Sequence, residues 1–244
     1  MILRPALFIR VFHCRARMER LLMKQWEVQV KPFEKAGLGE TEERTVGIRG
    51  RNFTLFTPKF IEDHIDSENP LQNFPLWAKV WEASWVLADF LAGLPADPDK
   101  RLIEIGCGLG LVGIVASSFG HRVLMTEHNK QALEFARANA TLNACPDLEI
   151  MDLDWNSPSL YGRFDYVVGS EVVYHQKDFE PLRGLFDRLL KSEGEVILCE
   201  GIRMTSLNFF KEMQEFYDLK AQQKSIRSAE KTVPVIFCRM KRKN

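Results

Sequence analysis

The chain has 244 residues, 45% of them hydrophobic, and its 33 basic residues balance 33 acidic ones. This is the composition of a globular protein with a full core, and the zero net charge gives no general reason to expect a nucleic-acid partner. Five scattered cysteines without a CxxC pair predict neither a disulfide framework nor a metal site, and favour free thiols in a reducing, cytoplasmic compartment. No apolar run approaches the roughly 18 residues that would span a bilayer.

The N-terminal segment differs in composition from the rest of the chain. Its first 17 residues carry four arginines and no acidic residue, a bias that is also typical of organellar import sequences. We interpret residues 1–20 as a separate basic segment and favour Met18 as the natural start, with organellar import as the alternative. Residues 21–75 are expected to form a β-rich extension, with strands at Trp26–Val30 and Asn52–Phe56.

Strand and helix patterns alternate regularly after this extension. Helices are expected at residues 78–92, 109–119, 130–143, 178–190 and 207–217. Strands are expected at residues 101–105, 122–127, 148–153, 164–169, 195–199, 220–226 and 233–240. Such alternation requires right-handed crossovers, so it predicts a doubly wound, mainly parallel seven-stranded sheet with helices on both faces. The last two strands are joined only by a turn and should form an antiparallel hairpin.

A glycine-rich loop follows the first strand of this sheet. It contains Gly106, Gly108 and Gly110, with Glu104 two residues before the first glycine. Glycines at a strand-to-helix turn let the backbone approach a ligand closely. Gly108, Gly110 and Gly113 also fit GxGxxG, so a nicotinamide-dependent oxidoreductase is an alternative. We favour S-adenosylmethionine, because a carboxylate at Glu104 would suit a cationic sulfonium and disfavour a pyrophosphate.

The next two strand ends carry further polar and aromatic residues. Glu127 closes the second strand, where a carboxylate can accept hydrogen bonds from both hydroxyls of a ribose. His128 follows it at the expected adenosine edge. Asp154 and Trp155 follow the third strand, where a carboxylate could accept the adenine amino group and an indole could stack on the ring.

At this point the sequence resembles the seven-β-strand protein lysine methyltransferases, a branch of the class I methyltransferases. The resemblance covers roughly Leu76–Arg203 and rests on the glycine loop, on Trp81–Leu87, on Leu153–Trp155 and on Ser170–Tyr174. The last segment matches the family pattern [D/E]-x-x-[Y/F], with Glu where the family usually carries Asp.

The resemblance implies that residues 76–244 form a Rossmann-like methyltransferase domain that N-methylates a protein lysine. Trp81 and Ser170 would contact the cofactor. Trp81 and Tyr174 would also wall a channel for the lysine stem, and Glu171 would orient the amine or the methionine end of the cofactor. Trp77 and Trp85 are expected one helical turn either side of Trp81, in the core or at its rim.

Several alternatives remain open at this stage. The substrate could be a small amine metabolite, and a binding module without turnover is a further option. No Asn-Pro-Pro-Tyr-like motif follows the fourth strand, which disfavours methylation of base amines and glutamine amides. We expect a monomer that works on a protein partner, without nucleic acid, membrane or metal.

The glycine loop gives a first prediction. The variant Gly106→Arg is expected to abolish binding of S-adenosylmethionine while the chain stays folded, because an arginine side chain obstructs the loop. Calorimetric titration with the cofactor measures the binding, and circular dichroism checks the fold. Unchanged binding would refute the assignment of the loop.

Overall fold

The structure is a computed structural model that describes residues 38–65, 68, 74–227 and 232–243. The basic segment 1–20 and the predicted strand Trp26–Val30 lie outside the described residues. No helix in the described ranges is long and apolar enough to cross a membrane.

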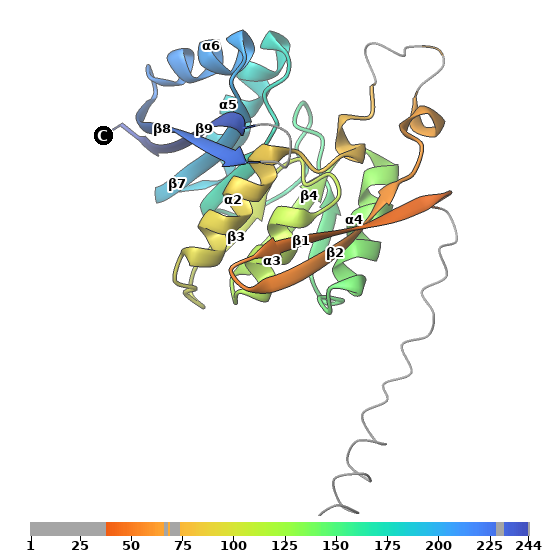
Figure 1. Cartoon of the computed structure of the whole chain (residues 1–244). Coiled ribbons are helices and arrows are strands. Elements are labelled where there is room, and N and C mark those ends of the chain that lie inside the picture. Colours follow the sequence, from red (N-terminus) through yellow and green to blue (C-terminus); the bar gives the residue numbers. More distant parts are fainter. Residues whose placement is uncertain (1–37, 66–67, 69–73, 228–231, 244) are drawn as a thin grey trace, which may run out of the picture. The chain divides into compact units, whose positions relative to one another are not determined.

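The described chain forms a two-stranded hairpin followed by an alternating α/β unit (Figure 1). The strands are β1 (Thr41–Ile48), β2 (Arg51–Pro58), β3 (Arg101–Glu104), β4 (Arg122–Glu127), β5 (Glu149–Asp152), β6 (Phe164–Ser170), β7 (Leu190–Gly201), β8 (Tyr217–Arg227) and β9 (Thr232–Arg242). The α-helices are α2 (Glu82–Gly93), α3 (Leu111–Ser118), α4 (Lys130–Leu142), α5 (Phe179–Leu189) and α6 (Met204–Met213). Short 3₁₀ turns are η1 (Ile61–His64), η2 (Leu76–Ala78) and η3 (Gln176–Asp178).

The main sheet confirms the predicted fold class. Its strand order is β5-β4-β3-β6-β7-β9-β8. The strands from β5 to β7 are parallel, and β9 runs antiparallel to both β7 and β8, as expected for a terminal hairpin. The strand order reverses beside β3, which pairs with β4 on one side and β6 on the other. A crevice outside the carboxyl ends of strands at such a switch point is the usual ligand site of this fold.

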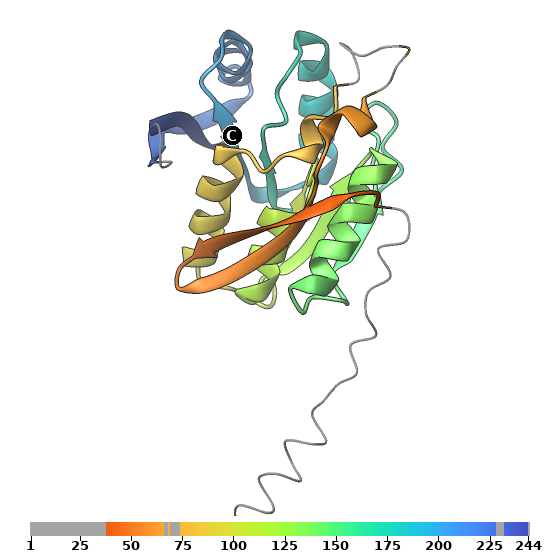
Figure 2. The same cartoon turned by 45° about the vertical axis from the view of Figure 1, so that its right-hand side comes forward.

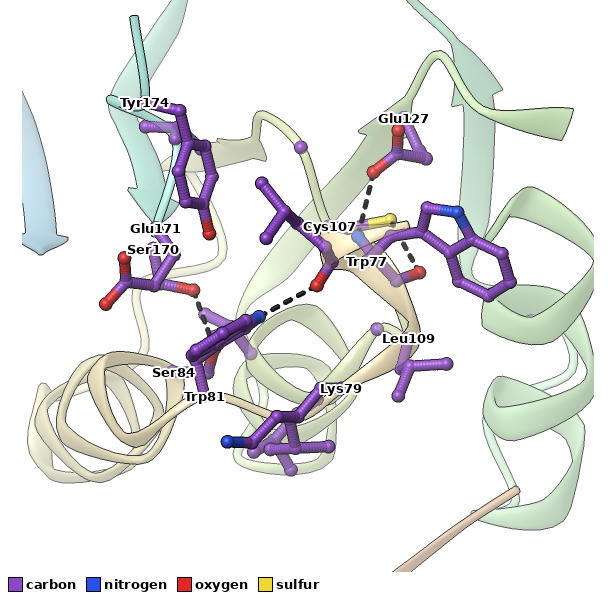
Figure 3. Close-up of a pocket in the computed structure, with 18 of the residues that line it drawn as sticks. Trp77, Lys79, Trp81, Ser84, Cys107, Leu109, Glu127, Ser170, Glu171 and Tyr174 are labelled. Atoms are coloured by element: carbon purple, nitrogen blue, oxygen red, sulfur yellow. Dashed lines mark hydrogen bonds between the residues drawn. The ribbon is translucent and has the colours of Figure 1, made fainter. Parts of the chain in front are cut away.

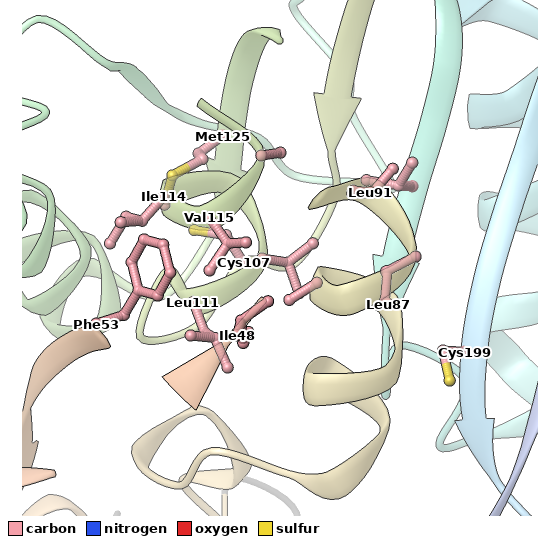
Figure 4. Close-up of a cluster of buried hydrophobic side chains, with 14 of the residues drawn as sticks. Ile48, Phe53, Leu87, Leu91, Cys107, Leu111, Ile114, Val115, Met125 and Cys199 are labelled. Carbon is pink, nitrogen blue, oxygen red and sulfur yellow. The ribbon is translucent and has the colours of Figure 1, made fainter. Parts of the chain in front are cut away.

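The N-terminal hairpin packs over helices on one face of the sheet. Ile48 and Phe53 lie in the same buried cluster as Leu87 of α2 and Val115 of α3 (Figure 4). Figures 1 and 2 show the hairpin crossing outside α3 and α4. Strand β1 was not predicted, because its sequence is charged and half of its residues are exposed. It is held by antiparallel pairing with β2 along its whole length, a partner that no local pattern reveals.

Helix α2 begins later than predicted. The chain from Pro75 to Ala78 forms a 3₁₀ turn, and the backbone is extended at Lys79 and Trp81. Trp81 is therefore the residue before the helix and not a member of it. The expectation that Trp77, Trp81 and Trp85 follow one another at helical spacing is wrong, since Trp77 belongs to the preceding turn.

One buried asparagine fastens the hairpin to the glycine loop. Asn139 of α4 accepts a hydrogen bond from the Phe56 N–H at 2.7 Å and donates to the Phe56 carbonyl at 3.1 Å. It also donates to the Leu109 carbonyl at 2.9 Å, and its side chain is fully buried. A single side chain thus links β2, α4 and the glycine loop.

The buried asparagine gives a stability prediction. Asn139→Ala removes three hydrogen bonds to backbone groups and should lower the free energy of unfolding by about 2–4 kcal/mol. Urea denaturation measures the change. Thr141→Ala, at an exposed position of the same helix, is the control and should stay within about 0.5 kcal/mol. Equal effects of the two substitutions would contradict the anchoring role of Asn139.

Candidate functional site

A cavity opens at the carboxyl edge of the sheet, between the glycine loop, the start of α2 and the segment after β6 (Figure 3). Nine of the twelve predicted site residues line it: Trp81, Gly106, Gly108, Gly110, Glu127, Trp155, Ser170, Glu171 and Tyr174. Glu104, His128 and Asp154 are not among its lining residues. The structure thus brings together residues from strands that are distant in the sequence.

The glycine loop makes a turn that side chains would disturb. Gly106 has φ +61°, and a Cβ placed on it would come within 3.1 Å of the Val172 side chain and 3.2 Å of the Trp155 ring. The loop backbone therefore passes directly against the indole of Trp155. A side chain at Gly106 would strain the backbone and collide with this ring, so Gly106→Arg obstructs the cavity from its inner wall.

Glu127 at the end of β4 holds the glycine loop in place. One carboxylate oxygen accepts a hydrogen bond from the Gly108 N–H at 2.9 Å, and the other accepts from the N–H groups of His128 at 2.8 Å and Asn129 at 3.0 Å. A carboxylate offers about four lone-pair positions. Three are used here, so Glu127 retains capacity for a hydroxyl of a bound ligand.

His128 and Asp154 are turned to other partners. The His128 ring lies 3.0 Å from a carboxylate oxygen of Asp152. Asp154 accepts a hydrogen bond from the Asn156 N–H at 2.9 Å and closes a local turn. An acid at a strand end can cap the following turn, as Asp154 does here, and the contacts of both residues with a cofactor stay predictions.

Glu104 does not lie where the electrostatic argument required it. Its side chain is 1% exposed, and one carboxyl oxygen would be only 2.6 Å from a Cβ built on Gly113. Strand alternation explains the placement: Leu102 faces the core beneath α2 and α3, and Glu104, two residues further along β3, points to the same face. Burial raises the pKa of Glu104 to about 8. Burial thus favours the neutral form of this carboxyl, and Glu104 is not among the residues that line the cavity.

The buried carboxyl of Glu104 predicts a pH dependence of stability. Because its pKa is raised in the folded state, the folded chain binds a proton that the unfolded chain releases above about pH 4.5. Its contribution to stability is therefore complete below that pH and is lost as the pH rises to about 8, by up to about 1.4 kcal/mol per pH unit.

Replacing this carboxyl by an amide tests the effect. Glu104→Gln should flatten the decline of unfolding free energy between pH 5 and pH 8, as measured by urea denaturation at a series of pH values. Glu134→Gln, at an exposed position of α4, should leave the decline unchanged. A decline of the same slope in Glu104→Gln would show that the buried carboxyl does not cause it.

Two tryptophans near the start of α2 line the cavity. The Trp81 indole N–H donates to the Leu76 carbonyl at 2.8 Å, and the Lys79 ammonium lies 4.5 Å from the Trp81 ring centroid. Trp77, which the sequence placed in the core or at its rim, also lines the cavity and packs against the ring of Phe135. Aromatic spacing alone could not show this, because the backbone changes conformation between the two residues.

Ser170 joins α2 to the end of β6. Its hydroxyl lies 2.9 Å from that of Ser84, so the two elements meet at the cavity wall. Glu171 follows in the left-handed region with φ +53°, an unusual conformation for a residue with a side chain. Its carboxylate accepts a hydrogen bond from the Gly201 N–H at 2.8 Å and lies 2.6 Å from the guanidinium of Arg203.

The sequence did not point to the partners of Glu171. Glu200 is fully buried at the end of β7 and accepts hydrogen bonds from the N–H groups of Val172 at 2.9 Å and Val173 at 3.4 Å. Tyr174 is half-buried on the cavity wall (Figure 3). Burial, with Glu171 and Glu200 nearby, raises the pKa of Tyr174 far above its usual value, so its phenol stays protonated.

The fold is the Rossmann-like fold of the class I methyltransferases. A solved structure of similar fold is the ribosomal protein L11 methylase of Lactobacillus delbrueckii subsp. bulgaricus, with a TM-score of 0.54 and 19% identity over 68% of this chain and 81% of that one. Residues 62–216 match the family model described as lysine methyltransferase. The chain therefore belongs to the lysine methyltransferase family.

Relatives in this family differ in their named targets. The protein N-lysine methyltransferase METTL21A of Mus musculus is 30% identical over 66% of this chain and 78% of its own length. The histone-arginine methyltransferase METTL23 of Xenopus laevis is 29% identical over 64% of this chain and 71% of its own length. The family membership removes the nicotinamide-dependent alternative.

Proposed function

We propose that the cavity binds S-adenosylmethionine and that the protein transfers its methyl group to the side-chain amine of a lysine in a partner protein. One observation carries this proposal. The glycine loop, Glu127 and Trp155 form one half of a cavity, which we call the cofactor half. Trp81 and Tyr174 form the other half, which we call the amine half. The two halves are next to each other, as a direct transfer between two molecules requires.

The residues of the cofactor half fit S-adenosylmethionine. The backbone at Gly106 has no room for a side chain beside Trp155, so the loop offers bare peptide groups to a ligand. Glu127 keeps acceptor capacity for a ribose hydroxyl, and the Trp155 indole offers an aromatic face for adenine. When bound, the cofactor supplies an electrophilic methyl group on a sulfonium.

The residues of the amine half fit an alkyl amine. The rings of Trp81 and Tyr174 line the cavity and offer apolar faces to the four-carbon stem of a lysine. Ser84 and Ser170 also line the cavity, with their hydroxyls 2.9 Å apart. The protein aligns the amine with the methyl group and excludes water. These are the main contributions of a protein to the displacement of a sulfonium by an amine.

The family supports a protein substrate over a small amine, because METTL21A is named for lysines in proteins. We further propose that the protein works in the cytoplasm, supported by the free thiols of Cys107, Cys145, Cys199 and Cys238. The monomeric state expected from the sequence stays a prediction, which size-exclusion chromatography can test.

Labelling with radioactive S-adenosylmethionine tests the proposed function. The protein is incubated with the labelled cofactor and a cell lysate, the products are separated by size, and the labelled protein is hydrolysed to amino acids. The label should appear in protein and be recovered as methylated lysine. The Gly106→Arg variant serves as the control and should transfer none.

Two results would contradict the proposed function. Label recovered only in molecules of low mass would identify a metabolite methyltransferase. Label recovered as methylated arginine would place the chain closer in activity to the relative named for histone arginine.

A further inference from the structure

Arg203 contacts three groups at the amine end of the cavity. It follows β7 directly before α6, and its guanidinium lies 2.6 Å from a Glu171 oxygen and 3.1 Å from a Glu200 oxygen. The same group stands over the ring of Tyr174, with its central carbon 4.8 Å from the ring centroid. One side chain thus joins two acids and an aromatic ring that come from separate segments.

The backbone that carries Arg203 is fixed by Ser206. The Ser206 hydroxyl accepts a hydrogen bond from the Arg203 N–H at 3.1 Å, and it lies 2.7 Å from the Gly201 carbonyl. Ser206 is fully buried. The segment between β7 and α6 is therefore held at both ends, which limits the positions that the guanidinium can take.

The two acids depend on this guanidinium. Glu200 is fully buried, and its carboxyl holds the backbone that leads to Tyr174 through the N–H groups of Val172 and Val173. The Glu171 side chain is only 7% exposed. Two neighbouring carboxyl groups with so little access to water cannot both ionise unless a cation lies between them. A guanidinium suits this position because its planar fork can bond two carboxylates while its face lies on a ring.

The charge of Glu171 matters for an incoming lysine. A carboxylate without a partner would hold the amine as an ammonium ion, which has no lone pair for attack on a methyl group. In the structure that carboxylate is already bound to Arg203 and to the Gly201 N–H. On this wall of the cavity, the lysine stem therefore contacts the Tyr174 ring and not the Glu171 carboxylate.

We propose that Arg203 is the positioning residue of the amine half: it fixes the ring of Tyr174 and occupies Glu171, so that the lysine meets the ring and not a free carboxylate. This inference rests on the proposed function. It assigns to Arg203 a role that acts through Tyr174, without contact to the cofactor half.

A double-mutant cycle tests the inference, with Arg203→Met, Tyr174→Ala and the combination of the two. Arg203→Met keeps the aliphatic stem and removes the guanidinium. It should lower kcat/KM for the acceptor lysine by about 10-fold or more, while the Kd for S-adenosylhomocysteine changes less than about twofold. The double variant should lose much less than the two single losses combined, because both substitutions remove the ring contact and only the release of Glu171 adds to the loss in Tyr174→Ala.

Two further variants separate positioning from general damage to the fold. Arg203→Lys keeps the charge without the fork and should recover only part of the lost activity. Arg183→Met is the matched control, because Arg183 also stands over a ring, that of Phe216 at 4.6 Å, and lies 3.9 Å from the Asp187 carboxylate. Its kcat/KM should stay within about twofold of the natural protein.

Additive losses in the cycle, or a parallel loss of S-adenosylhomocysteine binding in Arg203→Met, would overturn the inference.

A fluorine NMR spectrum, which needs no methyl transfer, tests the inference separately from the proposed function. The chain has four tyrosines, so fluorotyrosine labelling gives few fluorine resonances. Arg203→Met should shift or broaden that of Tyr174 most, and an unchanged Tyr174 resonance would also overturn the inference. If the natural protein methylates no lysine, the proposed function fails, whereas this spectrum still reports on Arg203.

Discussion

The Glu127 carboxylate, at the end of β4, holds the backbone of the neighbouring glycine loop through the Gly108 N–H. The loop needs such a clamp because Gly106, Gly108 and Gly110 all lie at positive φ, where the backbone has no regular partner within a helix or strand. With the loop fixed, the peptide at Gly106 lies against Trp155, and α3 begins at Leu111. This acid acts together with the Cys107 N–H, which donates to the Thr126 carbonyl of the same strand at 2.9 Å, so the cofactor half of the cavity depends on β4.

The opposite wall depends on a change of backbone conformation before α2. Trp81 lies just outside the helix, with its indole bonded to the carbonyl of Leu76. Trp77 lies in the preceding turn, so both rings can reach the cavity. The Ser84–Ser170 contact then joins α2 to β6, and Asn139 ties the hairpin to the glycine loop from behind. The hairpin thus supports the site without lining it.

Buried acids serve two different purposes in this fold. Glu104 sits beneath α3, where burial raises its pKa to about 8. Glu200 is equally buried, and burial with the nearby Glu171 raises its pKa to about 8, but it bonds the backbone of Val172 and the guanidinium of Arg203. Glu127, Glu171 and Glu200 each accept hydrogen bonds from backbone N–H groups, and only the first two line the cavity. Charge alone, read from the sequence, does not distinguish these roles.

The sequence by itself determined the chain order of the strands and helices of the main sheet, the glycine loop and the segments around Trp155 and Tyr174. These depend on periodicity and short spacing along the chain. The resemblance to lysine methyltransferases rested on the same local motifs. Only the tertiary structure decided that Glu104 is buried, that Trp77 reaches the cavity, and that Arg203 bonds Glu171. These outcomes depend on which face of a strand a side chain occupies and on which strand ends meet at the sheet edge. Such contacts join residues far apart in the sequence, and no local pattern encodes them.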